Sequence, residues 1–140
     1  MSIYLDSSVL VAAVVEDEPC HEACLLLLRR KNVATWTHAL AEVFSTLTGG
    51  RLGLRASPAV ANQLISSLTS RLRLIDLAAS DVMLAIQQAD AAGVRGGALY
   101  DYLHVLAARK IDAEEIYSLN ARHFDAVTRG VGPRIVAPTP

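Results

Sequence analysis

Short runs of apolar residues alternate along this chain with longer stretches in which apolar residues recur every three or four positions. The short runs predict buried β-strands, and the longer stretches predict helices. The strands are expected at residues 2–5, 33–35, 72–77, 115–119 and 134–137. The helices are expected at residues 9–15, 18–31, 37–49, 58–68 and 80–93 and around Asp101, with a short turn or helix at 122–127.

Residues that favour helix ends mark several of these boundaries. Helix starts are expected at Ser7 or Ser8, at Thr37, at Ser57-Pro58 and at Ser80, and helix ends at Gly49-Gly50 and Gly93. Strands that alternate with helices of about ten residues or more favour a parallel sheet covered on both faces. The fold class is therefore expected to be α/β, with function at the carboxyl ends of the strands.

Size and composition narrow the class of protein. A chain of 140 residues with 52% hydrophobic and 19% charged residues has the make-up of one folded domain, expected to span residues 1–140. Its apolar runs are shorter than the roughly 20 residues of a membrane helix, and its amino terminus lacks a secretory signal, so the expected location is the cytoplasm. The net charge of −1 does not indicate nucleic-acid binding by the molecule as a whole.

Two cysteines, Cys20 and Cys24, lie four residues apart and extend an apolar helical stripe that includes Leu27 and Leu28. Packing in the core is the expected role of both. The alternative is a thiolate metal site, which requires more ligands than these two cysteines and the neighbouring His21 supply.

One carboxylate lies in each of three apolar segments that are far apart in the sequence: Asp6 in residues 3–6, Glu42 in 40–44 and Asp101 in 99–103. Each also has an ordinary explanation, because Asp6 and Asp101 occupy positions typical of helix starts and Glu42 shares a polar helix face. If the three converge, their repulsion is tolerable only when a cation neutralises it. The leading hypothesis is a divalent-metal site.

The expected helix at residues 37–49 divides into two faces. Its core stripe is predicted to contain Leu40, Val43, Phe44 and Leu47, and its other face His38, Glu42, Ser45 and Thr46.

Four ordered segments carry a resemblance to a known family. They read IYLDSSVLV from residue 3, THALAEV from residue 37, GALYDYLHVLAA from residue 97 and YSLNARHF from residue 117. Together they resemble the motifs of PIN-domain ribonucleases, most closely the VapC toxins of bacterial toxin–antitoxin pairs. The resemblance implies a three-layer α/β/α sandwich with a mostly parallel sheet of about five strands. It also implies a Mg²⁺- or Mn²⁺-dependent endoribonuclease, usually a homodimer, that is inhibited by a VapB-like antitoxin.

By position, Asp6, Glu42 and Asp101 match the three main acidic ligands of that family. The fourth segment departs from the family pattern, because Ser118 and Asn120 stand where many members have threonine and an acid, and His123 precedes Phe124 where an acid is frequent. Asn120 keeps an oxygen without the charge, so the chain is expected to differ from two-metal members unless Asp125 compensates.

The residue types suit hydrolysis of RNA by water. Carboxylates leave Mg²⁺ most of its own waters, and such a water is deprotonated more easily. We expect Asp6 and Asp101 to be direct ligands and Glu42 to be a ligand or to orient the water. Ser7, Asn120 and Ser118 are expected to support the site.

Substrate contacts are expected from residues near the third and fourth motifs. The candidates are Arg95, Arg122, His104 and His123, while Tyr100, Tyr102 and Trp36 could stack on bases only if they are exposed. His104 and His123 could instead contact the carboxylates of the site, and for each histidine a purely structural role is a further alternative.

Two other classes of protein remain open at this point. A phosphoryl-transferring aspartate site normally has a second acid beside the first, whereas Ser7 and Ser8 follow Asp6. A non-catalytic PIN-like module that binds RNA or an antitoxin is favoured by Asn120 and by the near-neutral charge, and disfavoured by the three intact acids.

Overall fold

The computed structural model of the chain describes residues 1–128 and 130–140. These residues form a sheet of five strands, all parallel, in the order β3-β2-β1-β4-β5. The strands are β1 (Ile3–Leu5), β2 (Val33–Trp36), β3 (Arg73–Ile75), β4 (Glu115–Tyr117) and β5 (Arg134–Val136). The predicted number of strands and their parallel arrangement are confirmed.

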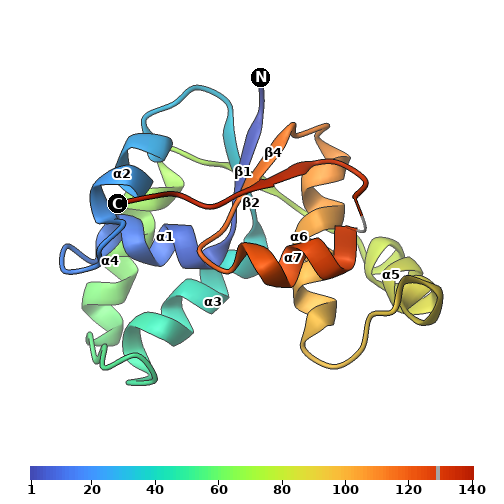
Figure 1. Cartoon of the computed structure of the whole chain (residues 1–140). Coiled ribbons are helices and arrows are strands. Elements are labelled where there is room, and N and C mark those ends of the chain that lie inside the picture. The colour runs from blue at the N-terminus through green and yellow to red at the C-terminus, as the bar shows by residue number, and fades with distance from the viewer. Residues whose placement is uncertain (129) are drawn as a thin grey trace.

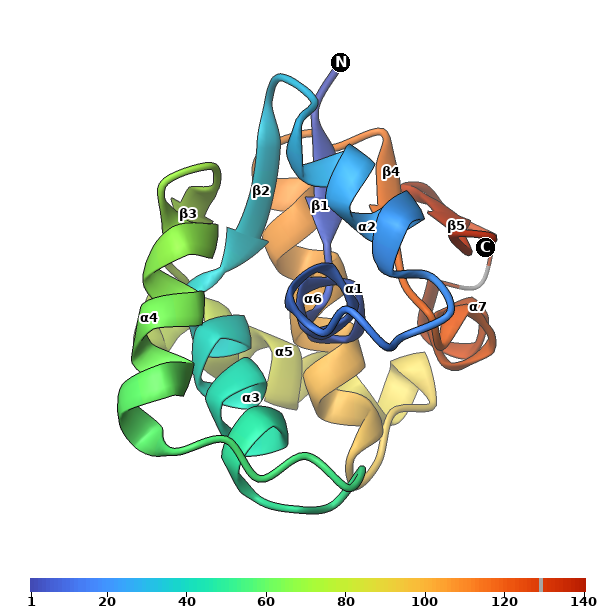
Figure 2. The ribbon, with the colours of Figure 1, turned by 90° about the vertical axis from the view of Figure 1, so that its left-hand side faces the viewer.

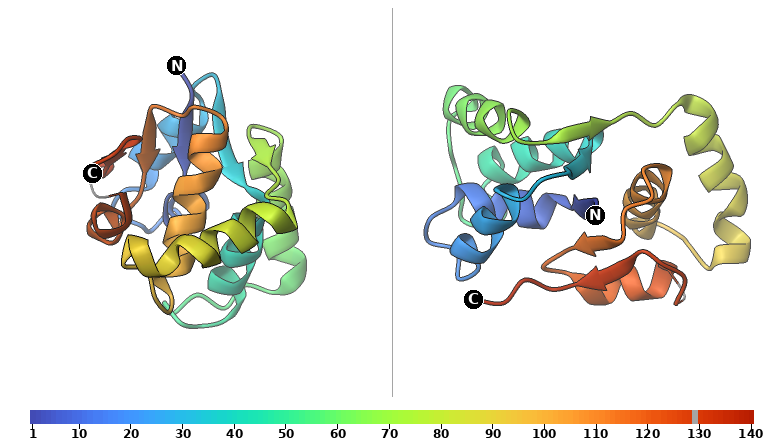
Figure 3. Two further views of the ribbon diagram at one scale, coloured as in Figure 1. Left: turned by 90° about the vertical axis from the view of Figure 1, so that its right-hand side faces the viewer. Right: turned by 90° about the horizontal axis from the view of Figure 1, so that it is seen from above.

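The described residues also form seven helices, which cover the sheet on both faces. They are α1 (Ser7–Val14), α2 (His21–Leu28), α3 (Thr37–Thr48), α4 (Pro58–Thr69), α5 (Ala79–Ala92), α6 (Ala98–Lys110) and α7 (Ala121–Thr128). Helices α1 to α4 lie on one side of the sheet and α5 to α7 on the other (Figure 1). Figure 2 faces the first layer, and the left panel of Figure 3 faces the second. The α/β/α sandwich expected from the resemblance is therefore confirmed.

The central strand β1 contributes to both cores. Ile3 and Leu5 pack with α1 to α4, whereas Tyr4 packs with α5 to α7, as the alternation of side chains along a strand requires. All three residues are fully buried. Cys24 belongs to the first core, and burial, with a smaller contribution from Cys20, raises the pKa of its thiol to about 12. The core-packing interpretation of Cys24 is confirmed, since a neutral thiol is a poor metal ligand.

Helix boundaries differ from expectation at three places. Helix α2 is shorter than the predicted 18–31, and Thr37 is the first residue of α3 rather than its cap, which is Trp36. Ser80 lies inside α5. That helix begins two residues earlier than expected, with Ala78 as its cap, and the Asp81 carboxylate accepts a hydrogen bond from the Ala78 amide at 2.8 Å.

Helix α3 is also rotated from the predicted orientation. Ala39, Val43 and Leu47 are its buried residues, whereas Phe44 is 39% exposed and Leu40 is only partly buried. The helix therefore buries a narrow stripe with a four-residue period. Its rotation turns Glu42 partly into the protein, toward Ser7 on α1 and His104 on α6.

None of the helices in the described part of the chain is long and apolar enough to cross a membrane.

Candidate active site

Asp6 combines a structural and a chemical position. It follows β1 directly, caps α1 by accepting a hydrogen bond from the Val9 amide at 3.1 Å, and is 4% exposed. The Ser8 hydroxyl donates to the same oxygen at 2.5 Å, and the Ser118 side chain forms a further hydrogen bond. Burial nevertheless raises the pKa of Asp6, although the charge of His104 and these hydrogen bonds oppose the shift. Asp6 can therefore cap α1 and also contribute a carboxylate to a metal site.

Both oxygens of Glu42 have protein partners. The Ser7 hydroxyl donates to Oε2 at 3.0 Å, and His104 Nε2 lies 3.1 Å from Oε1. Burial raises the pKa of Glu42, but the hydrogen bonds from His104 and Ser7 and the charge of His104 outweigh it, so the pKa is lowered overall. Glu42 is thus held ionised and in one orientation.

A buried tyrosine that sequence reasoning missed holds His104 in turn. The Tyr4 hydroxyl accepts a hydrogen bond from the Trp36 amide at 3.2 Å and lies 2.6 Å from His104 Nδ1. Because the ionised Glu42 carboxylate can only accept, His104 Nε2 carries the proton between them, and Nδ1 shares a hydrogen bond with the Tyr4 hydroxyl. Since His104 is 2% exposed, the expected contact with substrate is wrong, and the residue instead positions Glu42.

Asp101 lies in the first turn of α6, as predicted, and differs from the other two acids in its surroundings. Its carboxylate is partly buried and has no hydrogen-bond or ion-pair partner within residues 1–128 and 130–140. Burial raises the pKa of Asp101, the charges of Asp6 and Glu42 add to the rise, and His104 and His123 oppose it. The negative charges of Asp6 and Glu42 therefore act on the Asp101 carboxylate.

A pocket of about 750 Å³ opens at this carboxyl end of the sheet. Several predicted residues line it, namely Ser7, Glu42, Asn120 and His123. Ser8, His38 and Arg51 also line it and were missed by sequence reasoning. Ser8 could have been found from its place beside Asp6, but Arg51 lies in a loop after Gly49-Gly50 whose course no local pattern indicates.

Three other predicted residues, Ser118, Arg95 and Arg122, do not belong to the described lining of this pocket. Ser118 is fully buried, where its hydroxyl accepts a hydrogen bond from the Asn120 amide at 2.9 Å while its side chain contacts Asp6. Arg95, in the loop before α6, and Arg122, on α7, are exposed, and neither contributes to the described lining of the pocket.

The stacking candidates divide by exposure. Trp36 is 7% and Tyr102 6% exposed, so neither can receive a base, whereas Tyr100 is 51% exposed.

The donor chemistry at this end fits a hard divalent cation. Among the residues that the structure describes, Asp101 has no hydrogen-bond or ion-pair partner, and a cation would relieve its repulsion by Asp6 and Glu42. Within the described residues, however, no three His, Cys, Asp or Glu side chains are already spaced to share one ion. An ion that retains several waters, as Mg²⁺ does, would bridge carboxylates that lie farther apart.

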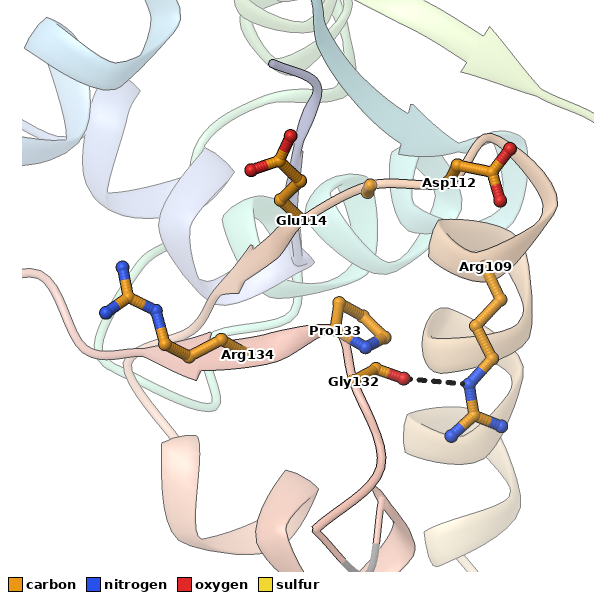
Figure 4. A pocket seen from close by; sticks show the side chains of 7 residues that line it. Arg109, Asp112, Glu114, Gly132, Pro133 and Arg134 are labelled. Atoms are coloured by element: carbon orange, nitrogen blue, oxygen red, sulfur yellow. Dashed lines mark hydrogen bonds between the residues drawn. The ribbon is translucent and has the colours of Figure 1, made fainter.

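A second, smaller pocket lies at the opposite end of the sheet. It measures about 410 Å³ and includes Arg109, Asp112, Glu114 and Arg134 in its lining. Figure 4 shows the Arg109 guanidinium directed to the carbonyl oxygen of Gly132, a hydrogen bond of 3.2 Å. The neighbouring Arg134 forms an ion pair with the buried Glu115. The buried carboxylate at this end, Glu115, is thus paired.

A family model described as the PIN domain matches residues 3–130. Three solved structures share the fold. VapC20 of Mycobacterium tuberculosis, described as a Sarcin-Ricin loop cleaving toxin, is 22% identical with a TM-score of 0.71, over 94% of this chain and 98% of that one. PAE2754 from Pyrobaculum aerophilum is 17% identical with a TM-score of 0.66, over 98% and 90% of the two chains.

The third structure is VapBC2 from Rickettsia felis bound to a DNA fragment from its promoter. It is 18% identical with a TM-score of 0.69, over 98% of both chains. A search of curated proteins finds no match.

Proposed function

The chain belongs to the PIN domain family, and from this premise we propose that it is a Mg²⁺- or Mn²⁺-dependent endoribonuclease that acts as the toxin of a type II toxin–antitoxin pair. One observation carries the proposal: Asp101 has no partner in the described structure and lies within electrostatic reach of Asp6 and Glu42 at the carboxyl end of a parallel sheet. That is where ligands bind in open α/β folds.

The residues take distinct roles in this proposal. Asp6 and Asp101 would hold the ion, and Ser8 and Ser118 keep the Asp6 carboxylate in place. A bound Mg²⁺ or Mn²⁺ would acidify a water molecule and neutralise charge on the attacked phosphate. Glu42, fixed by Ser7 and His104, orients the attacking water or completes the set of ligands.

The remaining polar residues act on the RNA. Asn120 and His123 line the pocket and face the phosphate backbone, and His123 also lies near enough to influence Asp101. Arg95 and Arg122 are exposed, and we place them along the path of the RNA outside the pocket. Because Asn120 carries no charge, we propose a site for one metal ion rather than two.

The wider setting follows from the same premise. VapC20 is described as a toxin that cleaves the Sarcin-Ricin loop, and VapBC2 was solved bound to promoter DNA. By analogy we propose a VapB-like antitoxin as partner, a homodimer as the assembly, the cytoplasm as location, and a single domain over residues 1–140. The RNA that this chain cleaves is not implied by that analogy.

Specific observations favour a second candidate, a non-catalytic PIN-like module that binds RNA or an antitoxin. Both Glu42 oxygens are already hydrogen-bonded, and no preformed set of three metal ligands exists in the part of the chain that the structure describes. Such a module would keep the fold and the pocket but would not hydrolyse RNA.

Cleavage of total RNA by the purified chain distinguishes the two. We expect cleavage with Mg²⁺ or Mn²⁺, none with EDTA, and none by Asp6→Asn, which still caps α1 because asparagine is also a good cap. Glu114→Gln, an exposed carboxylate at the other end of the sheet, is the matched control and should cleave normally. Cleavage that persists in EDTA or in Asp6→Asn contradicts the proposal.

A further inference from the structure

Three aromatic side chains form a continuous stack beside the acids. The Trp36 and His38 ring centroids lie 4.9 Å apart with a 36° angle between the planes. The His38 and Tyr100 centroids lie 5.6 Å apart with nearly parallel planes, at 11°. Trp36 is buried at the end of β2, so the stack begins in the core and ends at Tyr100 on the surface.

The outer ring of this stack is open to solvent. Tyr100 is 51% exposed, and the His38 side chain is 41% exposed. Stacking on His38 restricts the orientation of the Tyr100 ring while leaving about half of the side chain accessible. An ordered, exposed aromatic ring is a surface on which another flat ring can stack with little loss of conformational entropy.

Each of the two outer rings is fixed to one of the acids. Tyr100 precedes Asp101 in the first turn of α6. His38 lies one turn before Glu42 on α3, with its Nε2 atom 4.0 Å from Glu42 Oε1, and it also lines the large pocket. Each outer ring is therefore held by its helix next to one of the acids, and a base stacked on Tyr100 would lie beside the acid site.

We propose that the His38–Tyr100 pair is a stacking platform for an unpaired nucleobase of the RNA next to the cleaved bond. This inference rests on the proposed function and adds a substrate class to it. Every base has a flat face, so the platform selects little between sequences. It does select for structure, because a base within a duplex is already stacked on both faces, whereas a base in a loop or single strand can turn out onto the ring.

The test measures binding rather than cleavage, in the Asp6→Asn background with fluorescently labelled single-stranded RNA. Tyr100→Phe keeps the ring and should bind with unchanged Kd. Tyr100→Ala removes it and should weaken binding about tenfold, within the range known for base–aromatic stacking. Leu84→Ala, a similarly exposed apolar side chain on α5, is the control and should have no effect.

A double-mutant cycle combines the Tyr100 variants with oligonucleotides that carry one abasic nucleotide, placed at each position of the strand in turn. When the missing base is the one that occupies the platform, the abasic RNA should bind more weakly than intact RNA to the protein that retains Tyr100. Tyr100→Ala should then cause no further loss of affinity for that abasic RNA. Equal losses for intact and abasic RNA at every position overturn the platform. So does Tyr100→Ala binding as well as Tyr100→Phe, or an absence of RNA binding in all variants.

The two proposals fail separately in this design. RNA binding that depends on the Tyr100 ring, in a chain whose unmutated form does not cleave RNA, supports the platform and overturns the nuclease. Metal-dependent cleavage with ring-independent binding supports the nuclease and overturns the platform.

Discussion

Carboxylates at the two ends of the sheet differ in whether they have a partner. At the amino end, Glu115 is 5% exposed, yet it pairs with Arg134 and accepts a hydrogen bond from the Tyr117 hydroxyl at 3.1 Å. At the carboxyl end, Asp101 has no such partner among the described residues, and its pKa and that of Asp6 are raised. A buried acid is therefore not by itself a sign of function, whereas an acid left charged among other acids is.

The two ends of the sheet are also expected to contribute differently to the stability of the fold and to RNA cleavage. Paired charges at the amino end stabilise the fold, and the acids at the carboxyl end weaken it when no cation is bound. The comparison predicts that substitutions at the two ends will have opposite effects on folding and on cleavage.

The largest contrast is expected between Asp101→Asn and Glu115→Gln. Asp101→Asn should lower the rate of RNA cleavage about a hundredfold or more, because a metal ion contributes several kcal/mol to the reaction. Glu115→Gln should leave the rate unchanged but lower the free energy of unfolding by about 1–3 kcal/mol, because a charged hydrogen-bonding partner is lost. Initial rates and urea denaturation measure the two effects. Equal loss of activity in both variants would remove the distinction between the ends.

The relay from Tyr4 through His104 to Glu42 is expected to matter next most. Tyr4→Phe removes the hydroxyl that fixes His104, so Glu42 should lose its orientation and kcat should fall about tenfold, as for residues that position a metal ligand. Tyr102→Phe is the control, since its hydroxyl donates to Gln88 on α5 at 3.1 Å and not to the acids. Steady-state kinetics on one RNA should show a lowered kcat with little change in KM. A kcat equal to that of Tyr102→Phe would show that the relay is structural only.

The third effect concerns stability against pH in EDTA. Burial and the charges of Asp6 and Glu42 raise the pKa of Asp101 above its ordinary 3.8, so the folded chain binds this proton more tightly than the unfolded chain does. The stability that the proton provides is present below pH 3.8 and is lost as the pH rises through the raised value.

Asp101→Asn mimics the neutral form, so it should melt at a higher temperature than the unmutated chain at neutral pH and at a similar temperature in acid. Mg²⁺ should then raise the Tm of the unmutated chain more than that of the variant. Thermal melts across pH, with Glu114→Gln as control, measure both changes. A lower Tm for Asp101→Asn at neutral pH would show that this carboxylate stabilises the empty site.

The smallest effect is expected from Asn120→Asp, which sharpens the comparison by adding an acid at the carboxyl end. Asn120 is exposed, so the added charge should cost less than about 1 kcal/mol of stability without metal. In Mn²⁺ the variant should regain that loss, because the new carboxylate adds a charged ligand. Calorimetric titration measures the affinity and the number of ions bound. An unchanged affinity would place Asn120 outside the metal site.

Local sequence signals located the elements and the three acids. Asp6 after an apolar run, Ser57-Pro58 at a helix start and Gly93 at a helix end each act within one turn of chain, so the pattern alone was sufficient. The rotation of α3 could not be predicted from such local signals. Its apolar residues span two overlapping stripes that share Val43 and Leu47, and packing against α1 and α4 selects the one that includes Ala39.

The contact of Tyr4 with His104 was beyond sequence reasoning for a different reason, although Ser7 and Ser118 were predicted to support the site. Tyr4 and His104 are 100 residues apart, and each lies in a segment that reads as ordinary core. Nothing local distinguishes a buried tyrosine that orders a histidine from one that only fills space. The platform residue Tyr100 was a candidate, but only the fold separated it from Trp36 and Tyr102, which are buried.

The strand order has a last consequence for the behaviour of the molecule. From β1 the chain winds outward to β2 and β3 on one side and later returns to β4 and β5 on the other, so Glu42 comes from one helical layer and Asp101 from the other. The spacing of the acids is thus set by how the two layers sit across the sheet. If one layer slid past the other, the spacing of the acids would change while each layer kept its own packing. The proposed catalysis is therefore expected to depend on the relative position of the two helical layers.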